Sequence, residues 1–156
     1  MKCIVLAAGY ATRLYPLTEN FPKPLLKVNE RPIIEWLMDD VSKQIDEFVI
    51  VTNHKFSGVF EDWAKERINE TDEKIIIVDD GTEDNEHRLG AVKDLELALN
   101  HCEKDDYYLV MAGDNLLDFD LSLFIEFSLY KKTSCVMCHE ENDLKKKLLE
   151  ISTTRR

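Results

Sequence analysis

The sequence lacks any apolar run long enough to cross a bilayer, although 44% of its 156 residues are hydrophobic. A membrane helix needs about 18 to 20 consecutive apolar residues. The opening run MKCIVLAAG is too short for a secretory signal, and polar turn residues follow it instead of a cleavage pattern. We therefore expect a globular, cytoplasmic protein without a membrane partner.

Basic residues are also scarce, because 20 Lys and Arg face 31 Asp and Glu and give a net charge of -11. Proteins that bind nucleic acids need a surplus of basic residues, so no nucleic-acid partner is expected. The charge is uneven, since residues 1–36 hold more basic than acidic residues. A small anionic ligand would be attracted to this N-terminal segment.

Cysteine occurs only four times, and without an export signal we expect free thiols. The stretch CVMCH at 135–139 fits the C-x-x-C-H pattern of haem attachment, and C-x-x-C could form half of a zinc or redox site. Haem attachment normally requires export, and a zinc site would need a second ligand pair. We interpret residues 134–138 as an apolar strand with buried, unreactive thiols.

Short β-rich runs alternate with helical patterns along the whole chain. Strands are predicted at residues 3–7, 47–52, 74–78, 107–112 and 134–138, and helices at residues 32–43, 56–68, 89–100 and 121–131. This alternation is typical of a mainly parallel sheet with helices on both faces. The predicted fold class is therefore α/β, a Rossmann-like, doubly wound domain.

Glycine is scarce as well, and the usual glycine-rich phosphate motifs are missing. The chain has neither G-x-x-x-x-G-K-[ST] nor G-x-G-x-x-G, so neither a P-loop protein nor a dinucleotide-dependent oxidoreductase is expected. One glycine, Gly9, follows the first predicted strand within the stretch LAAGYATRLYPLTENFPKPLL at 6–26. Ligands of open α/β sheets bind beyond the carboxyl ends of the strands, which is where this stretch begins.

The stretch at 6–26 has the groups that an anion site needs. Gly9 permits close approach of backbone N–H groups to a phosphate, and Arg13 offers a planar fork of donors. Pro22 and Pro24 restrict the backbone around Lys23 and would hold its charge in place. We predict a phosphate-binding loop here, and the alternative is a solvated loop whose cations face water.

The motifs L-A-A-G-x-x-T-R-L-x-P-L-T and P-K-P-L resemble the signature of the sugar-phosphate nucleotidyltransferases, the nucleoside-diphosphate-sugar pyrophosphorylases. The segments R-P-I-I-E-W-L at 31–37 and LVMAGDN at 109–115 are similar to further segments of that family. Ala11 departs from the pattern, because the family usually has a second glycine there.

The resemblance implies site residues. Arg13 would lie against the triphosphate, Lys23 would lie near the reacting phosphates, and Asp114 would bind Mg²⁺, so these three are the predicted catalytic residues. Asp114 could instead cap a turn, and His54 is interpreted as a surface residue. The nucleotide-binding residues implied by the resemblance are Leu6, Ala7, Ala8, Gly9, Thr12, Arg13, Lys23, Asp80 and Gly90.

The resemblance also implies an activity in sugar nucleotide biosynthesis: transfer of a nucleoside monophosphate from a nucleoside triphosphate to a sugar-1-phosphate, with release of pyrophosphate. Alternatives are a cholinephosphate-type acceptor, or a nucleotide-binding module without turnover. Members of that family are usually longer, so we expect a truncated domain over residues 1–140, a short helix and polar tail over 141–156, and a possible homodimer.

Overall fold

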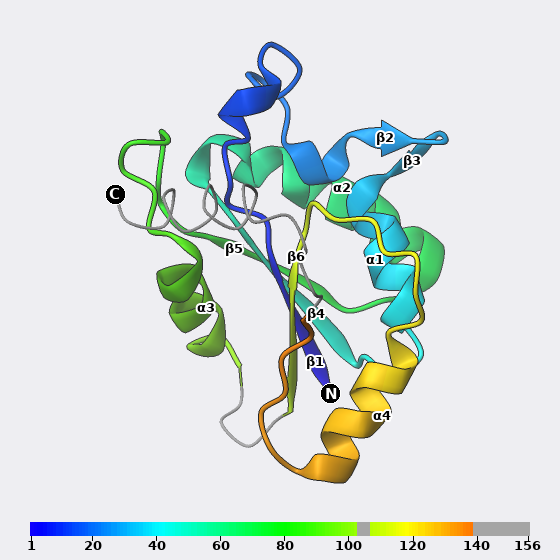
Figure 1. Cartoon of the computed structure of the whole chain (residues 1–156). Helices are drawn as coiled ribbons and strands as arrows, with labels where there is room; N and C mark the ends of the chain where they lie inside the picture. Colours follow the sequence, from blue (N-terminus) through cyan, green and yellow to red (C-terminus); the bar gives the residue numbers. More distant parts are fainter. Residues whose placement is uncertain (103–106, 139–156) are drawn as a thin grey trace, which may run out of the picture. The chain divides into compact units, whose positions relative to one another are not determined.

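The computed structural model of the chain describes residues 1–102 and 107–138 (Figure 1). The chain divides into two compact units, Met1–Ser122 and Leu123–Arg156. Among the described residues, no helix is both long enough and apolar enough to cross a bilayer. The predicted tail at 141–156 lies outside the described residues, so the predicted domain limits stay predictions.

The first unit is built on a four-stranded sheet in the order β5-β4-β1-β6. All three neighbouring pairs are parallel, with Ile4 of β1 opposite Val49 of β4 and Val110 of β6. The predicted doubly wound α/β class is confirmed. The strand bounds are Lys2–Leu6 for β1, Glu47–Thr52 for β4, Ile75–Asp79 for β5 and Tyr108–Ala112 for β6.

Both faces of the two central strands, β1 and β4, are buried, as expected for parallel strands that read as continuous apolar runs. Successive side chains of a strand point to opposite faces. One face contributes Ile4, Val49, Val51 and Val78 to a core cluster that also holds Ala98 of α3. The alternate side chains are buried too, and they are Cys3, Val5, Phe48 and Ile50.

Three helices connect these strands. Helix α1 (Ile33–Val41) joins β1 to β4 through the first loop, α2 (His54–Thr71) joins β4 to β5, and α3 (Ala91–Leu99) leads to β6. Figure 1 shows α3 on the other side of the sheet from α1 and α2. The chain therefore reverses direction across the sheet at β1, and such a switch point is where doubly wound folds bind ligands.

Local sequence explains where these helices begin and end. Pro32 immediately precedes α1, and Asn53 caps α2 by accepting a hydrogen bond from the Phe56 N–H at 3.1 Å. At the end of α2, Asp72 adopts the left-handed conformation that closes many helices. The sequence did not predict the small hairpin of β2 (Lys27–Val28) and β3 (Arg31–Pro32).

The strand predicted at 134–138 is wrong. These residues form no strand in the described part of the chain, and they follow α4 (Ser122–Lys131). Strand propensity is realised only where a neighbouring strand supplies hydrogen bonds, and no such pairing forms here. The prediction of buried thiols also fails, because Cys138 is exposed and Cys135 is half-buried. Cys3 is buried, which raises the pKa of its thiol to about 12.

Candidate nucleotide site at the carboxyl edge of the sheet

The carboxyl ends of the four parallel strands bring together four loops. The first loop with Gly9 follows β1, Asn53 follows β4, Asp80 follows β5, and Asp114 follows β6. The edge therefore collects backbone donors from one loop and carboxylates from two others. Most of the predicted site residues lie on these loops, while Lys23 comes from a turn further along the first loop.

The first loop leaves the sheet under firm backbone control. The Ala7 N–H donates to the Val51 carbonyl at 2.8 Å, and the Leu6 carbonyl accepts from Gly113 N–H at 2.9 Å. Ala7 and Ala8 are buried, whereas Gly9 is exposed and a Cβ at this position would meet nothing within 4 Å. Open space thus begins at Gly9, on the side where a ligand would approach.

Ala11, which stands where the family usually has a glycine, adopts a backbone conformation that favours glycine. It adopts φ 47° and ψ 40°, the left-handed region that costs a non-glycine residue about 1–2 kcal/mol. The hydroxyl of buried Thr18 donates to the Ala11 carbonyl at 2.8 Å and helps to hold this turn. The short helix η1 (Thr12–Leu14) follows directly, and Thr12 is exposed on it.

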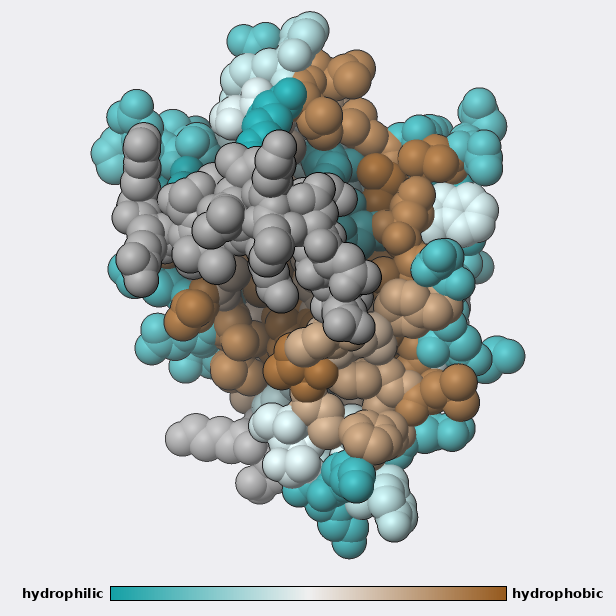
Figure 2. Space-filling view, viewed as in Figure 1, coloured by the Kyte–Doolittle hydropathy of each residue, from teal (hydrophilic) through white to brown (hydrophobic). Residues whose placement is uncertain are grey.

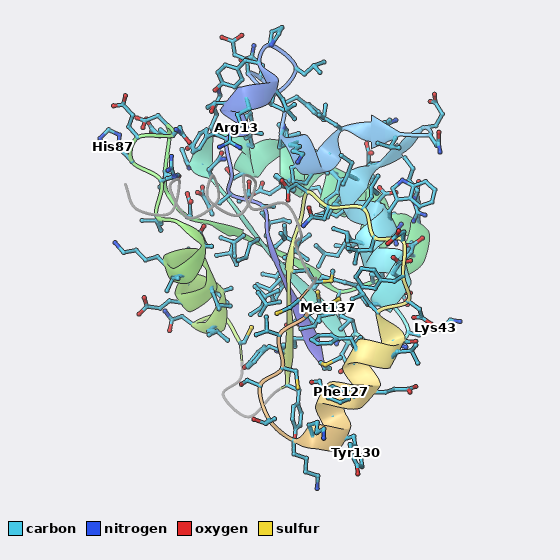
Figure 3. All side chains as sticks on the ribbon, in the orientation of Figure 1. Arg13, Lys43, His87, Phe127, Tyr130 and Met137 are labelled. Atoms are coloured by element: carbon cyan, nitrogen blue, oxygen red, sulfur yellow. The ribbon has the colours of Figure 1, made fainter. Side chains whose placement is uncertain are left out.

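Arg13 lies exposed on η1 and has no hydrogen-bond or ion-pair partner within the described part of the chain (Figure 3). An unengaged guanidinium is free to bind an anion without first breaking a protein contact. Figure 2 shows apolar surface beside this loop. Leu14 and Leu17 are 39% and 67% exposed, whereas Leu25 of the same loop is buried in the core.

Lys23 and Asp114 meet although 91 residues separate them in the sequence. The Lys23 Nζ donates to Asp114 Oδ2 at 2.8 Å, and both side chains remain partly exposed. Pro22 and Pro24 flank Lys23 at the start of η2 (Lys23–Leu25), where they restrict the backbone on both sides of this lysine. The structure therefore places two of the three predicted catalytic residues in direct contact.

Gly113 explains how Asp114 reaches this position. A Cβ at Gly113 would come within 3.0 Å of Val5 Cγ1 and 3.3 Å of Ala7 Cβ. A larger residue would push the end of β6 away from β1. The glycine in G-D-N thus permits the close approach of the two strand ends from which the first loop and Asp114 emerge.

Three residues that the sequence analysis did not select tie the loops together. The buried Asn53 amide donates to the Ala8 carbonyl at 3.1 Å while its oxygen caps α2. The buried Tyr10 hydroxyl donates to the Thr82 carbonyl at 2.7 Å, which links the first loop to the loop after β5. Asn53 had a readable signal, because an Asn immediately before a helix is a typical cap, whereas Tyr10 and Thr82 had none.

His54 pairs with Asp79 at the rim of the same edge. Its Nδ1 lies 2.6 Å from Asp79 Oδ2, and this hydrogen bond raises the pKa of the imidazole. The side chain is 57% exposed, which agrees with its interpretation as a surface residue. The backbone N–H of His54 also donates to the Thr82 carbonyl at 2.9 Å, so His54 helps to position the acidic loop.

Asp80 and Gly90 lie on the segment between β5 and α3. Asp80 Oδ1 accepts from both the N–H and the hydroxyl of Thr82 at 2.7 Å. Gly90 precedes α3 at φ 87°, and a Cβ there would meet nothing within 4 Å. Near them lies Asp94, a buried acid that the sequence analysis did not select; burial and the charge of Asp80 raise its pKa to about 6.

Replacing Asp94 with asparagine should raise stability in a pH-dependent way. In the folded protein Asp94 keeps its proton up to about pH 6, whereas the unfolded chain releases it near pH 4, so stability falls between these values. The amide escapes that loss. We expect a gain of about 1–2 kcal/mol at pH 8 and almost none at pH 4, measured by urea unfolding.

The matched control for this stability measurement is Glu96→Gln, which changes an exposed acid on the same helix. It should shift the free energy of unfolding equally, and only slightly, at both pH values. An Asp94→Asn variant with the same stability as the wild type at pH 8 would show that the carboxylate is not destabilising.

The carboxylates at this edge have the chemistry of partial magnesium ligands, where phosphate oxygens and water would supply the remaining ligands. Among the described residues, no group of three or more His, Cys, Asp or Glu side chains could enclose a metal by itself. Mg²⁺ is usually bound through one or two carboxylates together with phosphates and water. A single carboxylate such as Asp114, partly exposed and paired with Lys23 of the first loop, fits that mode.

The fold and this edge define a class: a doubly wound α/β domain that presents basic side chains and carboxylates at its switch point. The chain belongs to the Nucleotidyl transferase family, whose model matches residues 2–146. The resemblance seen in the sequence motifs is thereby confirmed.

Known relatives agree with this membership. The chain is 34% identical over 138 residues to the choline-phosphate cytidylyltransferase of Streptococcus pneumoniae, covering 85% of this chain and 55% of that protein. It is 26% identical over 144 residues to the D-glycero-alpha-D-manno-heptose 1-phosphate guanylyltransferase of Campylobacter jejuni, covering 92% and 59%. The chain thus spans little more than half the length of these relatives.

A solved structure is similar as well. A Bacillus anthracis protein assigned as a glucose-1-phosphate thymidylyltransferase superposes with a TM-score of 0.73 at 26% identity, over 85% of this chain and 51% of that one. The names of these similar proteins cover cytidylyl, guanylyl and thymidylyl transfer. Family membership therefore does not indicate one particular base.

Proposed function

We propose that the chain binds a nucleoside triphosphate at the carboxyl edge of its sheet and transfers the nucleoside monophosphate to a phosphorylated small molecule, preferentially a sugar-1-phosphate, in sugar nucleotide biosynthesis. The carrying observation is the 2.8 Å contact between Lys23 and Asp114, at the same edge of the sheet as the open space at Gly9. It supports a site that presents a cation and a metal-binding carboxylate to the same ligand.

In this reaction an oxygen of the acceptor phosphate forms a bond to the α-phosphorus. The bond from that phosphorus to the bridging oxygen breaks, and its electron pair leaves with pyrophosphate. The attacking oxygen is already anionic, so no side chain needs to remove a proton. Catalysis then depends on alignment and on reducing the repulsion between two phosphorylated partners.

The proposed roles follow from position and charge. Arg13, without a protein partner among the described residues, would bind the triphosphate together with backbone N–H groups near Gly9. Lys23 would move from Asp114 toward the reacting phosphates as they arrive. Asp114 would hold Mg²⁺, which supplies positive charge to phosphate oxygens when bound.

Turnover is tested by incubating the full chain with Mg²⁺ and measuring the pyrophosphate that is released. Each of five nucleoside triphosphates is combined with each of a panel of sugar-1-phosphates and with phosphocholine. Release in at least one combination, lost in Asp114→Asn, is the expected result. Binding of a triphosphate without release in every combination would favour the second candidate, a nucleotide-binding module without turnover.

A cholinephosphate-type acceptor is the other candidate within the same chemistry. It is supported by the 34% identity to a choline-phosphate cytidylyltransferase. The predicted homodimer and cytoplasmic location stay predictions. Exposed apolar side chains on α4 are compatible with self-association, and they are Leu123, Phe127, Leu129 and Tyr130.

A further inference from the structure

Two cysteines near the end of the described chain take no part in the proposed nucleotide site. Cys135 and Cys138 are free thiols on the segment that follows α4, and this segment is neither helix nor strand. Val136, which lies between them, is 83% exposed. Each Sγ approaches only a carbonyl oxygen of its own segment, at 3.5 Å and 4.0 Å. The pair therefore lies at the surface of its unit, where an ion can reach it.

The spacing and position of the pair suit a metal ion better than a redox role. Two cysteines separated by two residues are the usual half of a zinc site with four sulfur ligands. Thiols are activated for redox chemistry at the N-terminal end of a helix. Cys135 and Cys138 instead follow the C-terminal end of α4.

The described residues of one chain supply only half of such a site. Among residues 1–102 and 107–138, no group of three or more His, Cys, Asp or Glu side chains could hold a metal ion. A structural zinc site is tetrahedral and is almost always closed by four protein ligands. A second copy of this chain carries a second pair at the same spacing. In a two-fold dimer the same surface patch meets itself, so the two pairs would face each other.

Helix α4 and the segment after it offer apolar surface that a second copy would cover. The exposed apolar side chains are Leu123, Phe127, Leu129, Tyr130, Val136 and Met137. Figure 3 shows Phe127 and Tyr130 on the helix and Met137 on the segment that follows it. Burial of apolar surface favours association. The contact that joins the cysteines would thus also remove neighbouring apolar side chains from water.

Charge balance supports the same arrangement. A zinc ion with four thiolates has a formal charge of about −2, which neighbouring cations stabilise. Lys131 and Lys132 shortly precede Cys135, and residues 131–138 include no acid. Without the metal, these lysines and the net charge of -11 would oppose association of two copies. The dimer is therefore expected to depend on the metal.

We propose that Cys135 and Cys138 of two copies bind one zinc ion through four thiolates, and that this shared site joins the chain into a homodimer. Each thiol releases its proton to solvent when its sulfur binds the metal, so acid weakens the site. The inference uses no residue of the proposed nucleotide site. Either one can therefore fail without the other.

The test uses the full chain, freed of metal and kept reduced with a phosphine. Zn²⁺ is titrated by calorimetry, and assembly is followed by sedimentation velocity with and without the ion. We expect about one Zn²⁺ for every two chains, and a shift from monomer to dimer that EDTA reverses. Co²⁺ in place of Zn²⁺ should give the intense visible absorption of a tetrahedral thiolate site.

Serine variants assign the metal to the two cysteines. Cys135→Ser and Cys138→Ser should each lower zinc affinity by more than about 100-fold, because loss of a residue that only supports a ligand already costs about 10- to 100-fold. The metal-dependent dimer should disappear in both. Cys102→Ser, which removes another half-buried thiol, is the matched control and should preserve zinc binding. Unfolding of the metal-free variants in urea checks that they fold.

Tyr130→Ser tests the apolar part of the contact. Tyr130 is 81% exposed, so its removal should not disturb the fold of one chain. It should raise the protein concentration needed for the dimer and preserve the ratio of zinc to chain.

Several results would overturn the shared site. One is the absence of zinc binding, and another is a monomer that holds one zinc ion per chain. A dimer that forms equally well in EDTA would show that association does not need the metal. Zinc affinity that persists in both Cys135→Ser and Cys138→Ser, or that falls equally in Cys102→Ser, would assign the metal elsewhere.

Discussion

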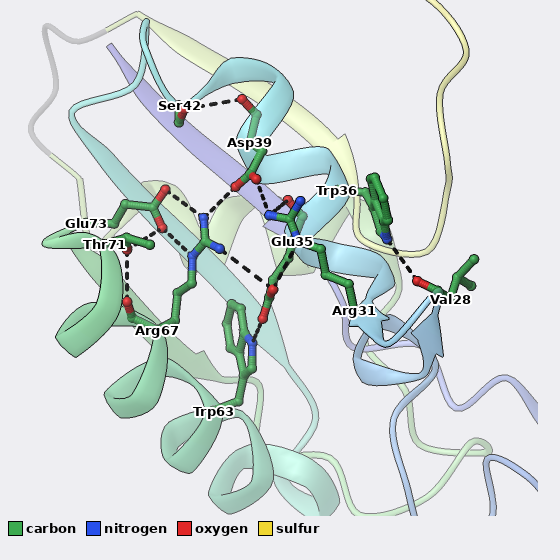
Figure 4. Close-up of polar contacts among 10 residues, drawn as sticks. All are labelled: Val28, Arg31, Glu35, Trp36, Asp39, Ser42, Trp63, Arg67, Thr71 and Glu73. Atoms are coloured by element: carbon green, nitrogen blue, oxygen red, sulfur yellow. Dashed lines mark hydrogen bonds and ion pairs between the residues drawn. The ribbon is translucent and has the colours of Figure 1, made fainter.

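Replacing Arg67 with alanine should lower the free energy of unfolding by about 2–3 kcal/mol, because it removes a buried cation that hydrogen-bonds to partly exposed carboxylates. Arg67 of α2 is only 7% exposed. Its guanidinium donates to Glu73 at 2.7 Å and 3.0 Å and to Asp39 at 2.6 Å, and it lies 3.7 Å from Glu35 (Figure 4). One side chain therefore joins α1, α2 and the residue that leads into β5.

The expected loss should depend on pH. Burial alone would raise the pKa of Asp39, but hydrogen bonds from Arg31 and Arg67 outweigh it and lower that pKa. A lowered pKa contributes stability above the ordinary aspartate range, and the contribution disappears as the carboxylate is protonated in acid. The difference between wild type and Arg67→Ala should thus be large at pH 7 and should narrow below about pH 4.

Urea unfolding at these two pH values measures the effect. Arg67→Lys is an informative companion, because it keeps the charge and loses the planar fork, and it should lie between wild type and alanine. The control is Lys65→Ala on the same helix. Lys65 forms an ion pair with Asp62, and the two side chains are 69% and 80% exposed. That change should cost less than about 1 kcal/mol. A similar small loss for Arg67→Ala would contradict a structural role for the network.

Much of the fold could be predicted from the sequence because its strands are parallel and central. Runs such as CIVL and FVIVT are apolar at successive positions and therefore on both faces of a strand, a pattern that indicates a central, buried strand. Strands β1 and β4 form at these runs, as expected. The run at 134–138 has similar residues but forms no strand. Its composition is not sufficient, because a strand also needs a neighbour at the correct distance and register.

The site was predictable to the extent that it follows from topology. Parallel strands end at one edge, so residues after β1 and β6 had to lie near each other, and Lys23 does contact Asp114. The contact of Tyr10 with Thr82 depends on the path of a loop that carries no periodic pattern. Asp94 was missed for a different reason, since an acid in the first turn of a helix normally indicates an exposed position.

Replacing Arg13 with alanine should weaken binding of magnesium triphosphate by about 10- to 100-fold, corresponding to the loss of one or two hydrogen bonds to a charged group. Arg13 is exposed and contacts no acid among the described residues. Its removal should therefore leave the free energy of unfolding within about 0.5 kcal/mol of wild type. Reduced affinity at unchanged stability distinguishes a ligand-binding cation from a structural one.

Calorimetry with tripolyphosphate and with a triphosphate measures this effect, and both affinities should fall by the same factor because Arg13 is proposed to contact phosphate and not the base. Arg13→Lys should recover part of the loss, since it restores the charge without the fork. The control is Lys43→Ala, an exposed cation beyond the C-terminal end of α1 and far from Arg13 in Figure 3. An equal weakening in Lys43→Ala would mean that overall charge, and not the loop after β1, attracts the phosphates. Unchanged affinity in Arg13→Ala would show that Arg13 does not bind the phosphates and would remove it from the proposed site.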